Sequence, residues 1–146
     1  MISIEQKQNE IVETFRLLED WMDQYTYLVE TAQSVAVSEA VRCDANRIRE
    51  CQSEAWIDIR CNDGKINLAV DSDSLLVKGM LLLLVRILDG EPLATVCSAE
   101  LDFIETTELY QNVPPARITG LRSAVSKIRG VARQAAVKKN RNGLKK

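Results

Sequence analysis

The sequence of 146 residues contains no histidine. Histidine is the usual general base that activates a serine or cysteine nucleophile, so its absence argues against papain-like and serine-hydrolase mechanisms. Histidine is also a common zinc ligand, and the four cysteines, at positions 43, 51, 61 and 97, form no CxxC pair that would nucleate a zinc site without it. We therefore expect no structural metal.

The runs that mark export or membrane insertion are also missing. The first ten residues, MISIEQKQNE, contain neither a basic segment followed by an apolar run nor the Arg/Ser richness of a transit peptide. The most apolar stretch, Leu75–Leu88, is interrupted by Lys78 and Arg86 and is shorter than the ~20 residues of a membrane-spanning helix. We expect a cytoplasmic protein without a membrane span, whose thiols are reduced rather than paired.

Hydrophobic residues make up 46% of the chain and charged residues 27%, a balance typical of soluble globular domains. No segment resembles an interdomain linker, so we expect a single domain over residues 1–146. From Lys127 to Lys146 there are eight Lys/Arg and no acidic residue. We interpret this as a solvated helix end followed by a frayed basic tail over about 139–146, because no aromatic residues are interleaved to favour nucleic-acid binding.

Periodicity predicts helices at the N-terminus. Apolar residues recur at helical spacing between Ile4 and Leu18, and again between Trp21 and Ala32, which predicts a helical hairpin or a bent helix pair. The pattern lapses between Ser38 and Gln52, where polar residues dominate, and predicts a loop or a short edge strand.

A β-hairpin is expected in the middle of the chain. Apolar and polar residues alternate on both sides of the turn sequence Asn62-Asp63-Gly64; the alternating apolar positions are Ile57, Ile59, Cys61, Ile66, Leu68 and Val70. The following stretch, Leu75–Leu88, is apolar almost all round and predicts a central buried helix, with Ser72 and Asp73 as capping residues and Gly90 as its stop.

Prolines mark the later helices. Pro92 is expected to open a short helix and Pro114-Pro115 the last one, whose buried stripe would be Leu121, Val125, Ile128 and Ala132. The segment between Phe103 and Leu109 stays unassigned. Together these elements predict several helices and one antiparallel β-hairpin.

Among the four thiols, Cys51 lies in the polar segment before the hairpin, where a loop would present a reactive group. Cys61 and Cys97 are interpreted as core thiols, and Cys43 as an exposed accessory thiol. Arg47 and Arg49 favour the Cys51 thiolate, whereas Glu50 and Glu54 oppose it. The residues alone leave open whether Cys51 is reactive or an ordinary thiol.

The segment from Asn46 to Trp56, Asn-Arg-Ile-Arg-Glu-Cys-Gln-Ser-Glu-Ala-Trp, resembles the Asn-x-Val/Ile-x-Gly-Cys-Gln-Ser-x-Val-Trp motif of the SufE and CsdE family of sulfur-acceptor proteins. The resemblance continues nearly throughout the chain, in Asp71–Ser74, Val77-Lys78-Gly79, Pro115, Arg117, Gly120 and Leu121. Two departures are Glu50, where the family has glycine, and Ala55, where valine is commoner. Glu50 restricts positive φ and adds a negative charge beside the thiol.

This resemblance implies an α+β fold shared with the IscU scaffolds, and a protein that accepts sulfur from a SufS-type cysteine desulfurase and stimulates it. Cys51 would carry the sulfur as a persulfide and pass it to an iron–sulfur scaffold such as SufBCD. No cofactor of its own is implied, because pyridoxal phosphate belongs to the desulfurase. We expect a monomer that binds its partners transiently.

Matching positions imply that Arg117 and Asp73 lie near the Cys51 loop, where Arg117 would hold the loop or stabilise the thiolate and Asp73 would lock the resting conformation. Alternatively, Arg117 forms a surface salt bridge and Asp73 a plain helix cap. Asn46, Gln52, Ser53 and Trp56 would shape the loop. Two other functions stay open: a module that regulates a desulfurase without carrying sulfur, and a stand-alone sulfurtransferase that uses small donors.

Overall fold

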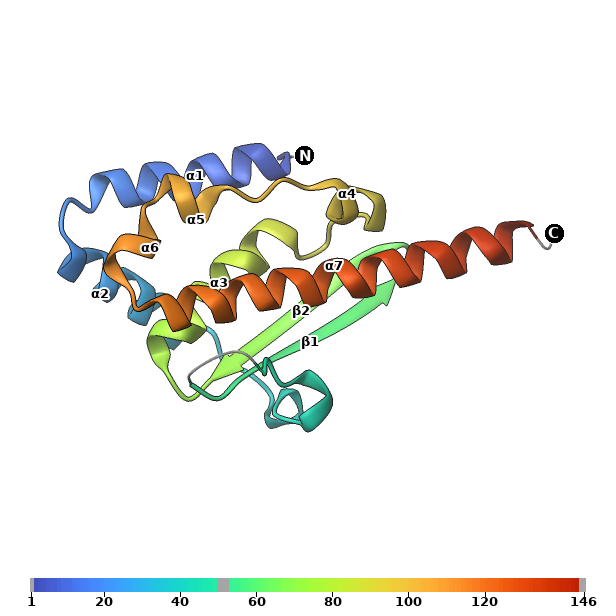
Figure 1. The fold of residues 1–146 in the computed structure, drawn as a ribbon, viewed down its shortest axis with the longest axis horizontal. Helices are drawn as coiled ribbons and strands as arrows, with labels where there is room; N and C mark the ends of the chain where they lie inside the picture. The colour runs from blue at the N-terminus through green and yellow to red at the C-terminus, as the bar shows by residue number, and fades with distance from the viewer. Residues whose placement is uncertain (1, 50–52, 145–146) are drawn as a thin grey trace.

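The computed structural model describes residues 2–49 and 53–144, and shows helices arranged around a two-stranded hairpin (Figure 1). This confirms the α+β fold and its small antiparallel sheet. In chain order the elements are α1 (Ile4–Leu17), α2 (Trp21–Gln33), the 3-10 turns η1 (Glu39–Val41) and η2 (Asp44–Asn46), β1 (Ala55–Asn62), β2 (Lys65–Ser72), α3 (Leu75–Leu88), α4 (Leu93–Ser98), α5 (Phe103–Thr106), α6 (Leu109–Asn112) and α7 (Pro115–Leu144).

The predicted helix pair at the N-terminus is confirmed as α1 and α2. A capping box opens α1: the Ser3 hydroxyl accepts from the Gln6 amide at 3.1 Å, and the Gln6 side chain accepts from the Ser3 amide at 3.0 Å. The Asp20 carboxylate opens α2 by accepting from the Asp23 amide at 2.9 Å. These caps fix the residues at which the two helices begin.

The hairpin forms where the alternation predicted it. Its turn residues, Asp63 and Gly64, both have positive φ, 54° and 75°, which suits the right-handed twist of the strands. The register pairs Ile57 with Val70 and Cys61 with Ile66. Ile57, Ile66 and Val70 are buried, and β2 packs against α3.

The central helix α3 has the predicted bounds, but the predicted cap is wrong. Ser74, rather than Ser72 or Asp73, caps α3 through its hydroxyl, which accepts from the Val77 amide at 3.3 Å. The Ser72 hydroxyl instead donates to the Glu54 carbonyl at 2.7 Å. Gly90, with φ of 80°, follows the last turn as expected.

Cys61 is exposed, so its assignment to the core is wrong. The backbone of the opposite residue, Ile66, is bonded on its outer side to Gly90 and Glu91, at 2.7 and 2.9 Å. Gly90 and Glu91 therefore cover the outer edge of β2. Along β1, the burial of side chains ends after Ile59. Strand alternation gives the face of a residue, but not how far along the strand the covering elements extend.

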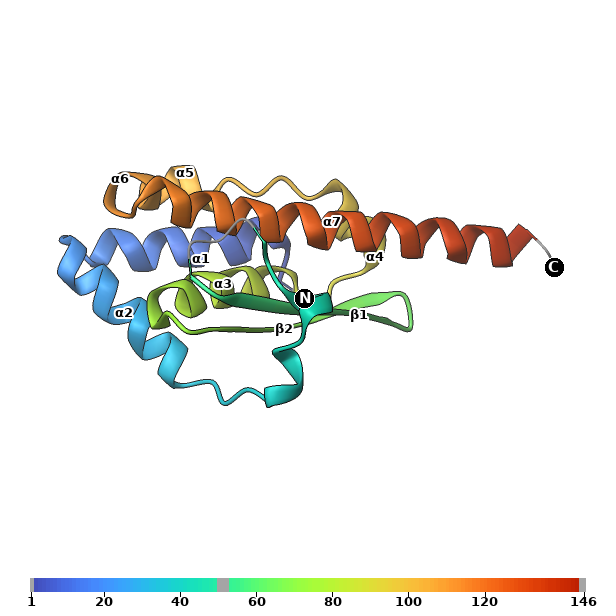
Figure 2. The same ribbon diagram turned by 60° about the horizontal axis from the view of Figure 1, so that its bottom comes forward.

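The long helix α7 begins at Pro115, as predicted, and passes over the hairpin before it extends beyond the rest of the molecule (Figures 1 and 2). Leu121, Ile128 and Ala132 of its predicted stripe are buried, and Val125 is half-buried. The helix continues to Leu144, through most of the segment that was expected to be a tail. Among the described residues, no helix is both long and apolar enough to cross a membrane.

Gly79 sets the closest approach between α2 and α3. A Cβ atom added at Gly79 would lie 2.2 Å from the carbonyl oxygen of Leu28, which is backbone and cannot swing away. Leu28 itself is fully buried, so the two helices have no room to separate without opening the core.

We therefore expect Gly79→Ala to lower the free energy of unfolding by about 1–3 kcal/mol, the usual cost of overpacking. Gly130→Ala is the matched control, because an added Cβ there meets nothing within 4 Å and alanine favours the helix by up to about 1 kcal/mol. Urea denaturation of both variants tests this, and equal stabilities would contradict it.

Candidate functional site

The sequence predicts a loop around Cys51, and the described residues on its two sides are held together at its base. The Ile48 amide donates to the Ala55 carbonyl at 2.9 Å, Arg47 and Trp56 form an isolated β-bridge, and Arg47 pairs with Glu54 at 3.1 Å. Glu50, Cys51 and Gln52 lie outside the described residues. The segment predicted as a loop or short edge strand contains, in its described part, two 3-10 turns and this bridge.

Arg117, in the first turns of α7, reaches the C-terminal side of this loop. Its guanidinium donates to the Ser53 hydroxyl at 2.5 Å, across 64 positions of sequence. The Arg117 side chain is half-buried beside Ile48 and Leu121, which also border a small hollow. The structure thus brings Arg117 and Ser53 together, whereas the resemblance implied only that Arg117 lies near the Cys51 loop.

The end of β2 and the residue that follows it hold the same end of the loop. The Glu54 carbonyl accepts from the Asp73 amide at 3.0 Å and from the Ser72 hydroxyl at 2.7 Å. Asp73 therefore lies beside the loop base through its backbone. Its carboxylate is exposed and pairs with Arg42 at 2.7 Å.

Arg42 was not singled out from the sequence, yet its guanidinium contacts three side chains near the base of the loop. It donates to Asp71 and to Asp73, each at 2.7 Å, and its guanidinium carbon lies 4.6 Å from the centre of the Trp56 ring. The hydrogen bonds to Asp71 and Asp73 raise the pKa of Arg42 above its ordinary value. Trp56 and Asp71 face each other across the hairpin, so Arg42 fastens the η1 segment to that face.

Lys127 of α7 binds the residues that follow Arg42 and lead into the loop. Its ammonium donates to the carbonyls of Ala45 and Arg47, at 2.9 and 3.4 Å. Burial and then the positive charge of Arg49 lower the pKa of Lys127, and nearby Cys43 partly offsets this. The approach to the loop is therefore held between the hairpin and α7.

Asn46 and Trp56, which the resemblance implied would shape the loop, make contacts that hold the fold. The Asn46 amide donates to the Val41 carbonyl at 3.0 Å, which closes the turn between η1 and η2. Trp56 is buried at the start of β1. Cys43 is exposed, and Cys97 is partly buried against the core. The described residues contain no group of three or more His, Cys, Asp or Glu placed to bind a metal.

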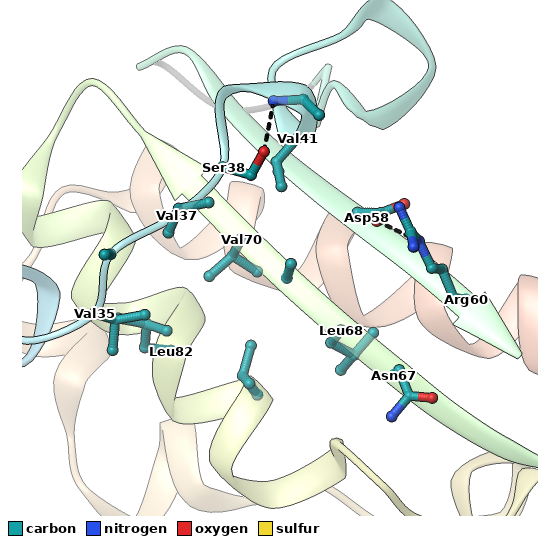
Figure 3. Close-up of a pocket in the computed structure, with 14 residues that line it drawn as sticks. Val35, Val37, Ser38, Val41, Asp58, Arg60, Asn67, Leu68, Val70 and Leu82 are labelled. Atoms are coloured by element: carbon teal, nitrogen blue, oxygen red, sulfur yellow. Dashed lines mark hydrogen bonds and ion pairs between the residues drawn. The ribbon is translucent and has the colours of Figure 1, made fainter. Parts of the chain in front are cut away.

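A separate hollow of about 400 Å³ lies beside β2 (Figure 3). Its walls are mostly apolar, with Val35 and Val37 from the segment after α2, and Leu82 from α3. Asp58 and Arg60, which pair at 2.9 Å, border it on the hairpin. None of the residues that hold the Cys51 loop lines this hollow.

Comparisons with known proteins agree with this geometry. A family model described as "SufE: Fe-S metabolism associated domain" matches residues 9–132. An uncharacterised SufE-like protein of Rhizobium etli is 26% identical over 134 residues, covering 88% of this chain and 90% of its own. A second, from Rhizobium meliloti, is 24% identical over 130 residues, covering 85% and 93%.

A solved structure is similar in fold. The solution structure of a hypothetical protein from Thermus thermophilus has a TM-score of 0.73 and 24% identity, and the match covers 94% of this chain and 99% of that one. The likeness confirms the arrangement of helices around the hairpin.

Because Asp71 is buried, removing Arg42 leaves a carboxylate without its main donor. We expect Arg42→Ala to lower the urea midpoint of unfolding clearly. Arg60→Ala, which breaks an exposed ion pair with Asp58 on the same face of the hairpin, should change it little. Equal effects of the two substitutions would show that the Arg42 contacts do not support the fold.

Proposed function

The chain belongs to the SufE family, and we propose that it accepts sulfur from a SufS-type desulfurase and carries it on Cys51. Membership of this family implies a cysteine desulfurase as partner. The observation that carries this proposal is that the described residues on both sides of Cys51 are tethered. Ile48 is bonded to Ala55, and Arg117 reaches Ser53 from a different helix. A carrier needs its cysteine on a segment that a rigid scaffold presents to partners.

The chemical step is thiol–persulfide exchange. The Cys51 thiolate attacks the outer, sulfane sulfur of the desulfurase persulfide, a new S–S bond forms on Cys51, and the old S–S bond breaks. The desulfurase cysteine leaves as a thiolate with the electron pair of the broken bond. The terminal sulfur keeps its proton, so no oxidant or reductant is consumed.

Positive charge near the loop favours the thiolate that this step needs. Arg117 lies at one end of the loop and Arg49 at the other, whereas Arg47 is paired with Glu54. Lys127 lies beneath the approach to the loop. This charge balance opposes the effect of Glu50, which replaces the family glycine.

We propose that the chain uses no cofactor of its own and acts as a cytoplasmic monomer. The pyridoxal phosphate that releases sulfur from cysteine belongs to the desulfurase. The proposed recipient is an iron–sulfur scaffold of the SufBCD kind, in keeping with the iron–sulfur description of the family.

Intact-mass spectrometry tests the carrier role. After incubation with a SufS-type desulfurase, pyridoxal phosphate and cysteine, the wild type should gain about 32 Da for each sulfur atom, and Cys51→Ser should gain none. Cys43→Ser and Cys61→Ser are matched controls, because both thiols are exposed, and they should load normally.

Two outcomes would favour the other functions. A Cys51→Ser variant that stimulates the desulfurase fully would indicate regulation without sulfur transfer. Turnover with thiosulfate, in the absence of any desulfurase, would indicate a stand-alone sulfurtransferase.

The contact between Arg117 and Ser53 can be tested by a double-mutant cycle. Arg117→Ala and Ser53→Ala should each slow persulfide loading of Cys51 several-fold, and the double variant should be no slower than Arg117→Ala alone. Arg122→Ala is the control, because Arg122 lies on the same helix but pairs with Glu105. Additive effects of the two substitutions would contradict a shared role in holding the loop.

A further inference from the structure

The last part of α7 leaves the body of the molecule. Ala132 is fully buried and Ala135 still packs against the core, whereas Val137 is 52% exposed and Lys138 is exposed. The helix continues for nine residues beyond Ala135, to Leu144, which corresponds to about 13 Å. Figures 1 and 2 both show this end projecting past the other elements. The basic segment is therefore a projecting helix through Leu144, where the sequence led us to expect a frayed tail.

Positive charge is concentrated in this projecting end. Residues 133–146 contain six Lys/Arg and no Asp/Glu, whereas residues 1–132 contain 13 Lys/Arg and 21 Asp/Glu, a net charge of −8. Arg133 and Lys138 are exposed and form no ion pair within the described residues. The chain thus carries a basic helix that points away from an acidic body.

The projecting end is separate from the region proposed to carry sulfur. The family model matches residues 9–132, so residues 133–146 lie outside the matched domain. Among the described contacts, Lys127 is the most C-terminal residue of α7 that binds the segment leading into the Cys51 loop. A role of residues 133–146 therefore does not depend on the sulfur-carrier role.

The composition of the projecting end limits the kind of partner it fits. A helix that docks in a protein groove, or lies on a membrane, uses an apolar face. After Ala136 the chain has only two large apolar residues, Val137 and Leu144, which are too few for such a face. Nucleic-acid phosphates require only positive charge, so charge complementarity favours nucleic acid as the partner.

We propose that the projecting end of α7 binds double-stranded DNA through its phosphates, without reading the base sequence. An α-helix is about 10–12 Å in diameter and fits the major groove of B-form DNA, which is about 12 Å wide. The major groove of A-form RNA is too narrow for it. Aromatic residues, which this segment lacks, stack on the bases of single strands. Their absence therefore argues against single strands and not against a duplex.

Fluorescence anisotropy of a fluorescein-labelled DNA duplex of about 16 base pairs tests the proposal with the full chain. Binding should be saturable at about 50 mM NaCl and should weaken as salt is raised, because bound phosphates release counterions. The triple variant Lys138→Gln/Lys139→Gln/Arg141→Gln should bind tenfold or more weakly. Its plot of log affinity against log salt should be flatter by about 2.7, which is about 0.9 for each of three lost phosphate contacts.

A second triple variant, Arg16→Gln/Arg60→Gln/Arg122→Gln, is the matched control. It removes the same charge from exposed, ion-paired positions on the body of the molecule. Its affinity and its salt dependence should equal those of the wild type. Equal weakening by the two triple variants would overturn the proposal, because only net charge would then matter. The absence of saturable binding by the wild type would overturn it as well.

Competition distinguishes duplex DNA from other polyanions. Duplex RNA of the same sequence, single-stranded DNA and poly-L-glutamate, each at equal charge concentration, should compete at least fivefold less well than unlabelled duplex DNA. Equal or stronger competition by poly-L-glutamate would favour an acidic protein surface, and by either of the other two a different nucleic acid. Each of these results would overturn the proposal. Persulfide loading of Cys51 in the projecting-end variant should be unchanged, so the two proposals fail separately.

Discussion

The burial of α3 on every side is the constraint on which the other elements depend. Because this helix is apolar almost all round, it must be covered by α1, α2, β2 and α7 together. The contact of Gly79 with the Leu28 carbonyl fixes how closely α2 can lie. The hairpin packs on another side of α3, and α7 also contacts both α3 and β1. Both ends of the Cys51 loop are therefore anchored to elements that the core already holds in place.

The loop is held by polar contacts that come from several elements. Arg117 binds it from α7, Ser72 and Asp73 bind it from the end of β2 and the residue after it, and Lys127 binds the segment that leads into it. Arg42 stiffens the outer face of the hairpin beside it. Because these side chains meet only when the core is formed, the placement of the described residues on either side of Cys51 is coupled to folding as a whole.

Two buried glutamines show how a satisfied and an unsatisfied amide differ in this fold. Gln8 of α1 uses both ends of its side chain: it donates to the Glu100 carbonyl and accepts from the amides of Asp102 and Phe103, which fixes the entry to α5. Gln24 uses only its nitrogen. Gln8 therefore fixes the position of α5 relative to α1.

The sequence by itself determined the longer helices, the hairpin and its turn, because apolar periodicity and the Asp63-Gly64 pair act locally. The short helices α5 and α6 were not predicted, because four residues are too few to show a helical period. It also singled out Arg117 and Ser53 through a family resemblance. Only the tertiary structure decided that Arg42 joins Asp71, Asp73 and Trp56, that Ser74 caps α3, that Cys61 is exposed, and that Gln24 lacks a donor within the described chain. These features depend on which elements cover one another, and residues that lie far apart in sequence acquire such neighbours only when the core packs.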